Sequence, residues 1–181
     1  MTTFTTTLTA AIHRPDPSEY DPYYERYISL VQTDDMAATL QKQAQETRDL
    51  LANLTAERSE FRYAPKKWSV KEVLGHVNDT ERIMSYRVLR IARGDQTPIE
   101  GFEQDDYVAG GKFARRTMDD LLQEFLTIRN ATIQLIRHLD PEAAERRGTA
   151  NQKQISARAL IYVIAGHELH HRRLLQEKYL K

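Results

Sequence analysis

The chain has 181 residues, of which 40% are hydrophobic and 29% charged, and its 26 basic and 26 acidic side chains leave no net charge. This size and composition predict one globular domain with a substantial core. The charge balance argues against a general nucleic-acid binder, which usually carries a basic excess. Because there is no cysteine, disulfides and thiolate ligands are excluded, and any metal must be held by His, Asp or Glu.

The sequence also indicates where the protein resides. No apolar run approaches the roughly 20 residues that cross a bilayer. The Thr-rich start lacks the positive charge and apolar block of a secretory signal. We therefore expect a cytoplasmic protein with no membrane partner.

Residues 1–13 are expected to form a flexible extension, and residues 14–181 the folded domain. Residues 14–31 carry three prolines, which prevent a long helix at the start of this segment. They also carry four tyrosines, for which we favour packing of this arm onto the body of the domain over the alternative, ligand binding.

Four segments have apolar residues three and four positions apart, the spacing of an amphipathic helix. The predicted helices span residues 35–54, 69–93, 117–139 and 156–179. Asp34 or Asp35 can cap the first, Ser69 opens the second in a capping box with Glu72, and Gly94 ends it. No strand-like alternation is evident, and we interpret residues 140–154 as a polar linker. The pattern predicts an all-α four-helix bundle with an N-terminal arm.

A long loop, residues 95–116, joins the second and third helices. It contains three of the seven glycines and one proline. Loops of this length in small domains are often lids or binding loops. An ordinary surface crossover is an equally good interpretation.

The last helix carries two histidines on its apolar face. At about 100° per residue, His167 and His171 lie one turn apart in the stripe that includes Val163 and Ile164. Each buried imidazole has a donor and an acceptor to satisfy. A metal ion can bind one nitrogen of each, because His at i and i+4 can reach the same ion. The alternative is a pair of core histidines bonded to other side chains.

His76, on the second helix, is the third metal ligand that we predict. It lies on a flank of the apolar stripe of that helix, which it shares with Thr80 and Arg87. Three protein ligands leave a coordination position open, as catalytic sites do. Arg87 could bind an anionic substrate group, or it could be a plain surface residue.

The remaining polar candidates are less strongly indicated as parts of the metal site. Asp79 could orient the ring of His76, or it could belong to a solvated helix face. His170 could compete with His171, and we place it beside the site or on the surface. We assign no role to His13 or His138.

Residues 167–171 also match HExxH, in which zinc peptidases use the Glu as general base. A peptidase usually takes a further ligand downstream, where only Glu177 is available, so we rank this activity last. Glu168 is our candidate catalytic residue, because it points about 60° from His171 and could act on a water at the metal.

The chain resembles the DinB-like superfamily of damage-inducible, metal-binding four-helix bundles. The resemblance rests on the proline- and tyrosine-rich arm and on KWSVKEVLGHVNDTERIMSYRVLRIARGD, GFEQDDYV and ALIYVIAGHELHH. It implies an up-down-down-up helix order, frequent homodimers, and zinc, nickel or a similar divalent ion held by His76, His167 and His171.

The superfamily includes bacillithiol S-transferases, mycothiol-dependent maleylpyruvate isomerase and metal-dependent hydrolases. The resemblance therefore implies a metal-dependent hydrolase or a small-thiol S-transferase acting on a small molecule. Without cysteine, thiol transfer would need an external low-molecular-weight thiol.

Three hypotheses follow. An enzyme would have an open coordination position and a pocket for a substrate. A non-catalytic metal-binding or stress-response interaction protein would have a closed site with a fourth protein ligand. In the third hypothesis the histidines only pack, and chelators leave stability unchanged.

Overall fold

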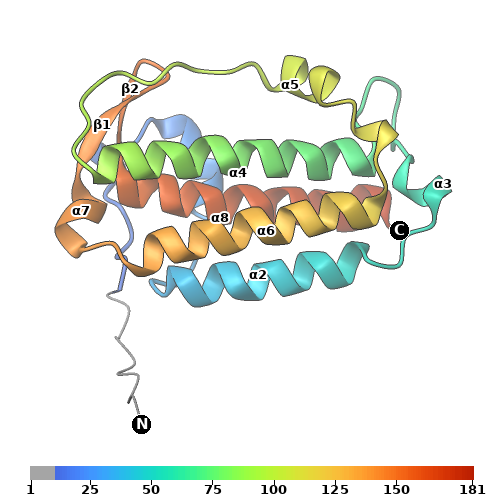
Figure 1. Cartoon of the computed structure of the whole chain (residues 1–181), viewed down its shortest axis with the longest axis horizontal. Helices are drawn as coiled ribbons and strands as arrows, with labels where there is room; N and C mark the ends of the chain where they lie inside the picture. Colours follow the sequence, from blue (N-terminus) through green and yellow to red (C-terminus); the bar gives the residue numbers. More distant parts are fainter. Residues whose placement is uncertain (1–10) are drawn as a thin grey trace, which may run out of the picture.

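Four long helices form the body of the computed structural model, which describes residues 11–181. They are α2 (Met36–Leu51), α4 (Val70–Ala92), α6 (Met118–Arg137) and α8 (Ala157–Leu174). α4 packs against α6 and α8, and α2 packs against the same two helices. α2 and α8 run in one direction and α4 and α6 in the other (Figure 1). The predicted all-α four-helix bundle and its up-down-down-up order are confirmed.

The helices begin where the sequence provides caps. The Ser69 hydroxyl accepts from the Glu72 N–H, and the Glu72 carboxylate accepts from the Ser69 N–H, so the predicted capping box is formed. Asp35, rather than Asp34, caps α2. Gly94 has a φ of +82° and follows the end of α4 as predicted. Local chemistry therefore sets the ends of these helices.

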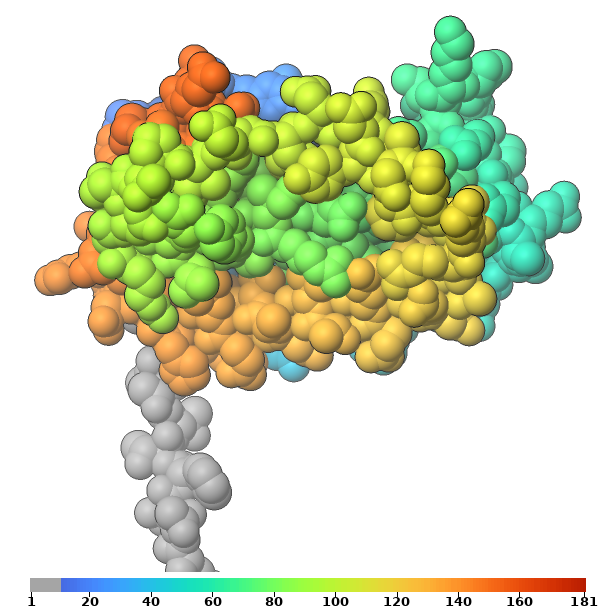
Figure 2. Space-filling view, turned by 45° about the horizontal axis from the view of Figure 1, so that its top comes forward, coloured from blue at the N-terminus to red at the C-terminus, as the bar shows by residue number. Residues whose placement is uncertain are grey.

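The long connection between α4 and α6 follows from the topology. These neighbouring helices are parallel, so the chain must return along the whole bundle, about 30 Å for a helix of this length. The connection contains α5 (Gln104–Gly111) and η3 (Phe113–Arg115), so it is more ordered than a plain loop. In Figure 2 it lies over α4 as a yellow-green band.

A β-hairpin occupies the segment that we interpreted as a polar linker, and that interpretation was wrong. After α7 (Pro141–Glu145), β1 (Arg147–Ala150) and β2 (Lys153–Ser156) pair antiparallel. The two-residue turn has φ of 49° at Asn151 and 62° at Gln152. Two-residue hairpin turns usually contain glycine. Because Gln152 takes the place of that glycine and each strand has only four residues, the sequence gives little indication of a hairpin. The Ile99 N–H donates to the Thr149 carbonyl at 2.9 Å, which ties the hairpin to the connection.

The N-terminal arm packs along α8. It comprises η1 (Pro17–Glu19), η2 (Pro22–Tyr24) and α1 (Glu25–Ile28). Gly166 permits the approach, because a Cβ atom there would lie 2.1 Å from the Tyr27 carbonyl oxygen. Residues 1–10 of the expected extension lie outside the described residues. Ile12 is buried, and its carbonyl accepts from the Tyr162 hydroxyl at 3.1 Å, so packing reaches back at least to this residue.

The core runs along the bundle between the four helices. Two short elements, α3 (Ala56–Ser59) and the π-helical turn η4 (Leu175–Tyr179), complete the structure. The apolar stripe predicted for α4 is buried throughout. Within residues 11–181, no helix combines the length and the apolar composition that crossing a bilayer demands.

Candidate metal centre

The three predicted ligands meet where α4 and α8 pack together. The Nε2 atoms of His76 and His167 are 3.0 Å apart, and the His171 ring centroid lies 4.9 Å from that of His76 and 4.5 Å from that of His167. One nitrogen from each ring can be chosen so that all three lie within 4.8 Å of one another. All three residues are buried, between 4% and 8% exposed. The structure thus brings together the three histidines that were selected from sequence.

The chemistry of this cluster fits a divalent cation. Burial lowers the pKa of His76 to about 4. Burial, reinforced by the neighbouring imidazoles, holds the pKa values of His167 and His171 well below the usual range. At neutral pH the rings are therefore uncharged and can offer lone pairs. The buried Nδ1 of His171 has no hydrogen-bond partner in the described part of the chain. An all-imidazole set suits zinc, nickel and other first-row divalent ions.

A cavity of about 440 Å³ gives access to the centre. His76 and His167 belong to its lining, while His171 does not. The remaining lining comes from the arm, the α4–α6 connection, the hairpin and the two helices: Asp21, Tyr23, Tyr24, Tyr27, Thr80, Met84, Arg87, Gly101, Phe102, Glu103, Gln104, Ala150, Asn151, Lys153 and Val163. The α4–α6 connection therefore crosses the bundle and also forms part of the cavity wall.

Most of these wall residues were not predicted from the sequence. Packing was preferred over ligand binding for the arm tyrosines, yet Tyr23, Tyr24 and Tyr27 line the cavity. The Tyr27 ring meets that of His167 edge-on, with centroids 5.3 Å apart. The glycine and aromatic residues of the α4–α6 connection could have indicated that Phe102 lines a binding cavity. Nothing in the sequence indicated Asn151 before the hairpin was known.

Glu168, the predicted catalytic residue, lies away from this cavity. It is 2% exposed and accepts a hydrogen bond from the Thr47 hydroxyl of α2. Arg172 lies 3.5 Å from the same carboxylate oxygen, and burial raises the pKa of Glu168. Glu168 does not line the cavity, so the geometry gives no support to its predicted role as a general base.

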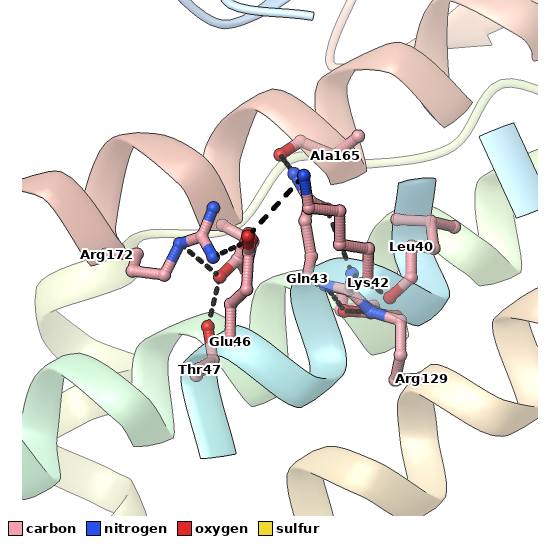
Figure 3. A network of polar contacts seen from close by, with 10 residues as sticks. Leu40, Lys42, Gln43, Glu46, Thr47, Arg129, Ala165 and Arg172 are labelled. Carbon is pink, nitrogen blue, oxygen red and sulfur yellow. Dashed lines mark hydrogen bonds and ion pairs between the residues drawn. The ribbon is translucent and has the colours of Figure 1, made fainter. Parts of the chain in front are cut away.

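Behind the histidines, a buried polar network joins all four long helices. The Arg129 guanidinium of α6 donates to the Glu81 carboxylate of α4 at 2.7 Å and to the Gln43 side chain of α2 at 3.1 Å. The Gln43 amide donates in turn to the carbonyl of Ala165 on α8 at 2.9 Å. Figure 3 shows Gln43 between Arg129 and Ala165. Because Ala165 and Glu81 lie close in sequence to His167 and His76, the network helps to fix both ligand-bearing helices.

The weaker candidates are spread around the centre. Asp79 lies 3.8 Å from Arg82, burial raises its pKa, and no hydrogen bond joins it to His76 among residues 11–181. His170 is exposed and packs edge-on against Tyr27, with centroids 5.6 Å apart. Of the two histidines without an assigned role, His13 hydrogen-bonds to Asp34 at 3.1 Å and His138 is exposed.

Comparisons with known proteins agree with this fold. The sequence matches the model of the DinB superfamily over residues 39–175. No curated protein matches it. YfiT from Bacillus subtilis, described as "a probable metal-dependent hydrolase with an unusual four-helix bundle topology", superimposes with a TM-score of 0.70 and 14% identity, over 91% of this chain and 92% of YfiT.

The mycothiol-dependent maleylpyruvate isomerase has a TM-score of 0.63 and 11% identity, over 80% of this chain and 61% of the isomerase. At these identities the structures show a shared fold, whereas the family match extends over most of the sequence. The chain therefore belongs to the DinB superfamily.

Proposed function

We propose that the protein is a metal-dependent enzyme that holds one divalent ion at His76, His167 and His171 and acts on a small molecule in the adjoining cavity. The observation that carries this proposal is the position of three buried, uncharged imidazoles beside a cavity of about 440 Å³. That volume falls within the range of small-molecule sites. Zinc or nickel would suit the ligands. When bound, the ion would lower the pKa of a water or a small thiol beside it.

The ligand set favours the enzyme over the non-catalytic alternative. Within residues 11–181, the cluster contains no fourth His, Asp or Glu. Glu168, the nearest acidic residue in sequence, is directed to Thr47 and Arg172 instead. A set of three protein ligands is typical of catalytic centres, whereas structural zinc sites usually have four. The two families of chemistry, hydrolysis and transfer to an external thiol, both fit this arrangement.

The first experiment measures metal content. The tag-free protein is dialysed against zinc or nickel, then against buffer, and analysed for bound ion. The parent should retain about one ion per chain, whereas His76→Ala and His171→Ala should retain little. His170→Ala is the matched control, because this histidine neighbours His171 and is exposed. A parent without metal, or equal loss in His170→Ala, would contradict the proposed centre.

The second experiment assigns the reaction. The loaded protein is tested on ester and amide substrates, and on electrophiles with and without an added small thiol. Turnover without thiol indicates a hydrolase, and turnover that requires thiol indicates an S-transferase. Stable ion binding without turnover in either series would favour the non-catalytic metal-binding or stress-response role. The expected homodimer stays a prediction, which light scattering after gel filtration can test.

A further inference from the structure

Arg87 lines the same cavity as His76 and His167, at some distance from them. It follows His76 by eleven residues on α4, which is three helical turns, or about 16 Å along the axis. Eleven steps of about 100° return to within about 20° of the starting direction, so both side chains leave the same face of α4. Both belong to the cavity lining, and Thr80 lies between them.

The charge of Arg87 is buried without a counter-ion. The residue is 2% exposed, and none of the ion pairs found in residues 11–181 includes it. One terminal nitrogen donates to the Glu100 carbonyl at 2.8 Å, the other lies 3.7 Å from the Met84 sulfur, and Nε has no partner. The other fully buried guanidinium, that of Arg129, is paired with Glu81 at 2.7 Å. A buried charge normally requires such a partner.

The surroundings of Arg87 indicate what could supply the missing charge. The Cζ atom of Arg87 lies 6.0 Å from the centroid of the Phe102 ring. Burial lowers the pKa of Arg87, and Tyr24 acts in the opposite direction. The other cationic side chain in the lining, Lys153, lies 3.5 Å from Asp21 and is exposed. The acidic Glu103 of the lining is exposed to solvent and makes no ion pair with Arg87 among the described residues. Arg87 is thus the buried cationic side chain of a cavity whose lining includes the aromatic residues Tyr23, Tyr24, Tyr27 and Phe102.

We propose that Arg87 binds a carboxylate of the substrate, so that the protein acts on small organic acids whose reactive group lies at the histidines. This inference rests on the proposed function, because it names the substrate class of the same cavity. A planar guanidinium pairs with a carboxylate through two parallel hydrogen bonds, which gives orientation as well as affinity. The acid would then span the cavity, with its carboxylate at Arg87 and its other end beside His76 and His167.

The test uses a pair of probes that differ only in charge, 3-phenylpropanoate and 3-phenylpropanamide. Their dissociation constants are measured by calorimetry, for metal-stripped and zinc-loaded protein. The acid should bind more tightly than the amide in both forms. Arg87→Met should weaken binding of the acid about tenfold to a hundredfold, the range for a hydrogen-bonded charge, and leave the amide unaffected. Arg87→Lys should retain more affinity than Arg87→Met.

Arg82→Met is the control variant. Arg82 lies on the same helix, is exposed, and pairs with Glu124 at 2.7 Å outside the cavity. It should bind the acid as the parent does. Circular dichroism checks that each variant is folded. If Arg87→Met does not fold, the comparison of acid with amide on the parent and on Arg87→Lys decides.

Three results would overturn the inference. They are equal affinity of the parent for acid and amide, no measurable binding of the acid, and binding of the acid that disappears on metal removal. The last result would place the carboxylate on the ion. Failure of the metal centre itself would be recognised separately, by the absence of bound ion, because the Arg87 test is also run on stripped protein.

Discussion

Replacing Gly166 by alanine should destabilise the protein by displacing the N-terminal arm. The new Cβ would lie 2.1 Å from the Tyr27 carbonyl oxygen and 2.5 Å from its carbonyl carbon. An ordinary van der Waals contact begins at 3.4 Å, which is roughly 1.3 Å more than the distance to the oxygen. The obstacle is backbone, so no side-chain rotation can relieve it. The arm must move, and α1 carries the fully buried Ile28 as well as Tyr27, which packs on His167.

The size of the effect follows from two opposing contributions. Overpacking costs about 1–3 kcal/mol, and we take the upper end because the backbone must shift. Alanine in place of glycine in a helix recovers about 1 kcal/mol. We expect a net loss of about 2 kcal/mol in the free energy of unfolding, which lowers Tm by about 4–8 °C for a chain of this size.

Urea unfolding followed by circular dichroism, with EDTA present so that bound metal does not contribute, measures this loss. Gly110→Ala is the matched control. It lies in α5, its Cβ would meet nothing within 4 Å, and its φ is not positive. This variant should be as stable as the parent or more stable, by up to about 1 kcal/mol. A Gly166→Ala protein with the stability of the parent would refute the role assigned to the close approach of arm and helix.

Three further predictions concern stability. Burial acts to raise the pKa of Glu19, but hydrogen bonds from Arg158, Ser156 and the Asp16 backbone outweigh it and bring the pKa to about 2. Its contribution is thus present above the ordinary pKa of 4.5 and lost as pH falls toward 2. Glu19→Gln should be about 2 kcal/mol less stable at pH 7, and the difference should close in acid urea titrations; a constant difference would contradict this. Arg129→Met should cost about 3–5 kcal/mol in denaturant unfolding by leaving Glu81 buried and unpaired, and the double variant with Glu81→Leu should regain much of that loss. Gln152→Gly should raise stability by about 0.5–1 kcal/mol, because glycine adopts the φ of 62° without strain, and an unchanged Tm would count against it.

The features that depend on local chemistry could be predicted from the sequence. Helix caps such as Ser69 act within one turn, and the i, i+4 spacing of His167 and His171 fixes their common direction on any helix. The third ligand required an argument about which helices face each other. His76 was expected on the flank of its stripe and is 4% exposed. α4 is contacted by α6, by α8 and by the connection, so more than one stripe of this helix is buried.

The features that depend on tertiary contacts could not be predicted. Glu168 was expected near the metal because of its angle from His171. Instead it accepts a hydrogen bond from Thr47 of α2, on the other side of α8. Arg87 was left between a binding and a surface role, because its burial depends on the connection that crosses above it. The hairpin turn uses Gln152 where glycine is usual, so its strongest sequence signal is missing.

The floor and the rim of the cavity are under different constraints. The floor consists of helix faces, and the hydrogen bonds of Arg129 and Gln43 tie these helices to the rest of the bundle. The rim consists of three connecting segments, residues 21–27, 101–104 and 150–153, that come from distant parts of the chain. Substitutions in the rim other than at Tyr27, whose ring packs on His167, can therefore alter the entrance of the cavity without moving the histidines. If the protein is the enzyme proposed above, this architecture lets substrate choice diverge in evolution while the histidine centre is inherited unchanged.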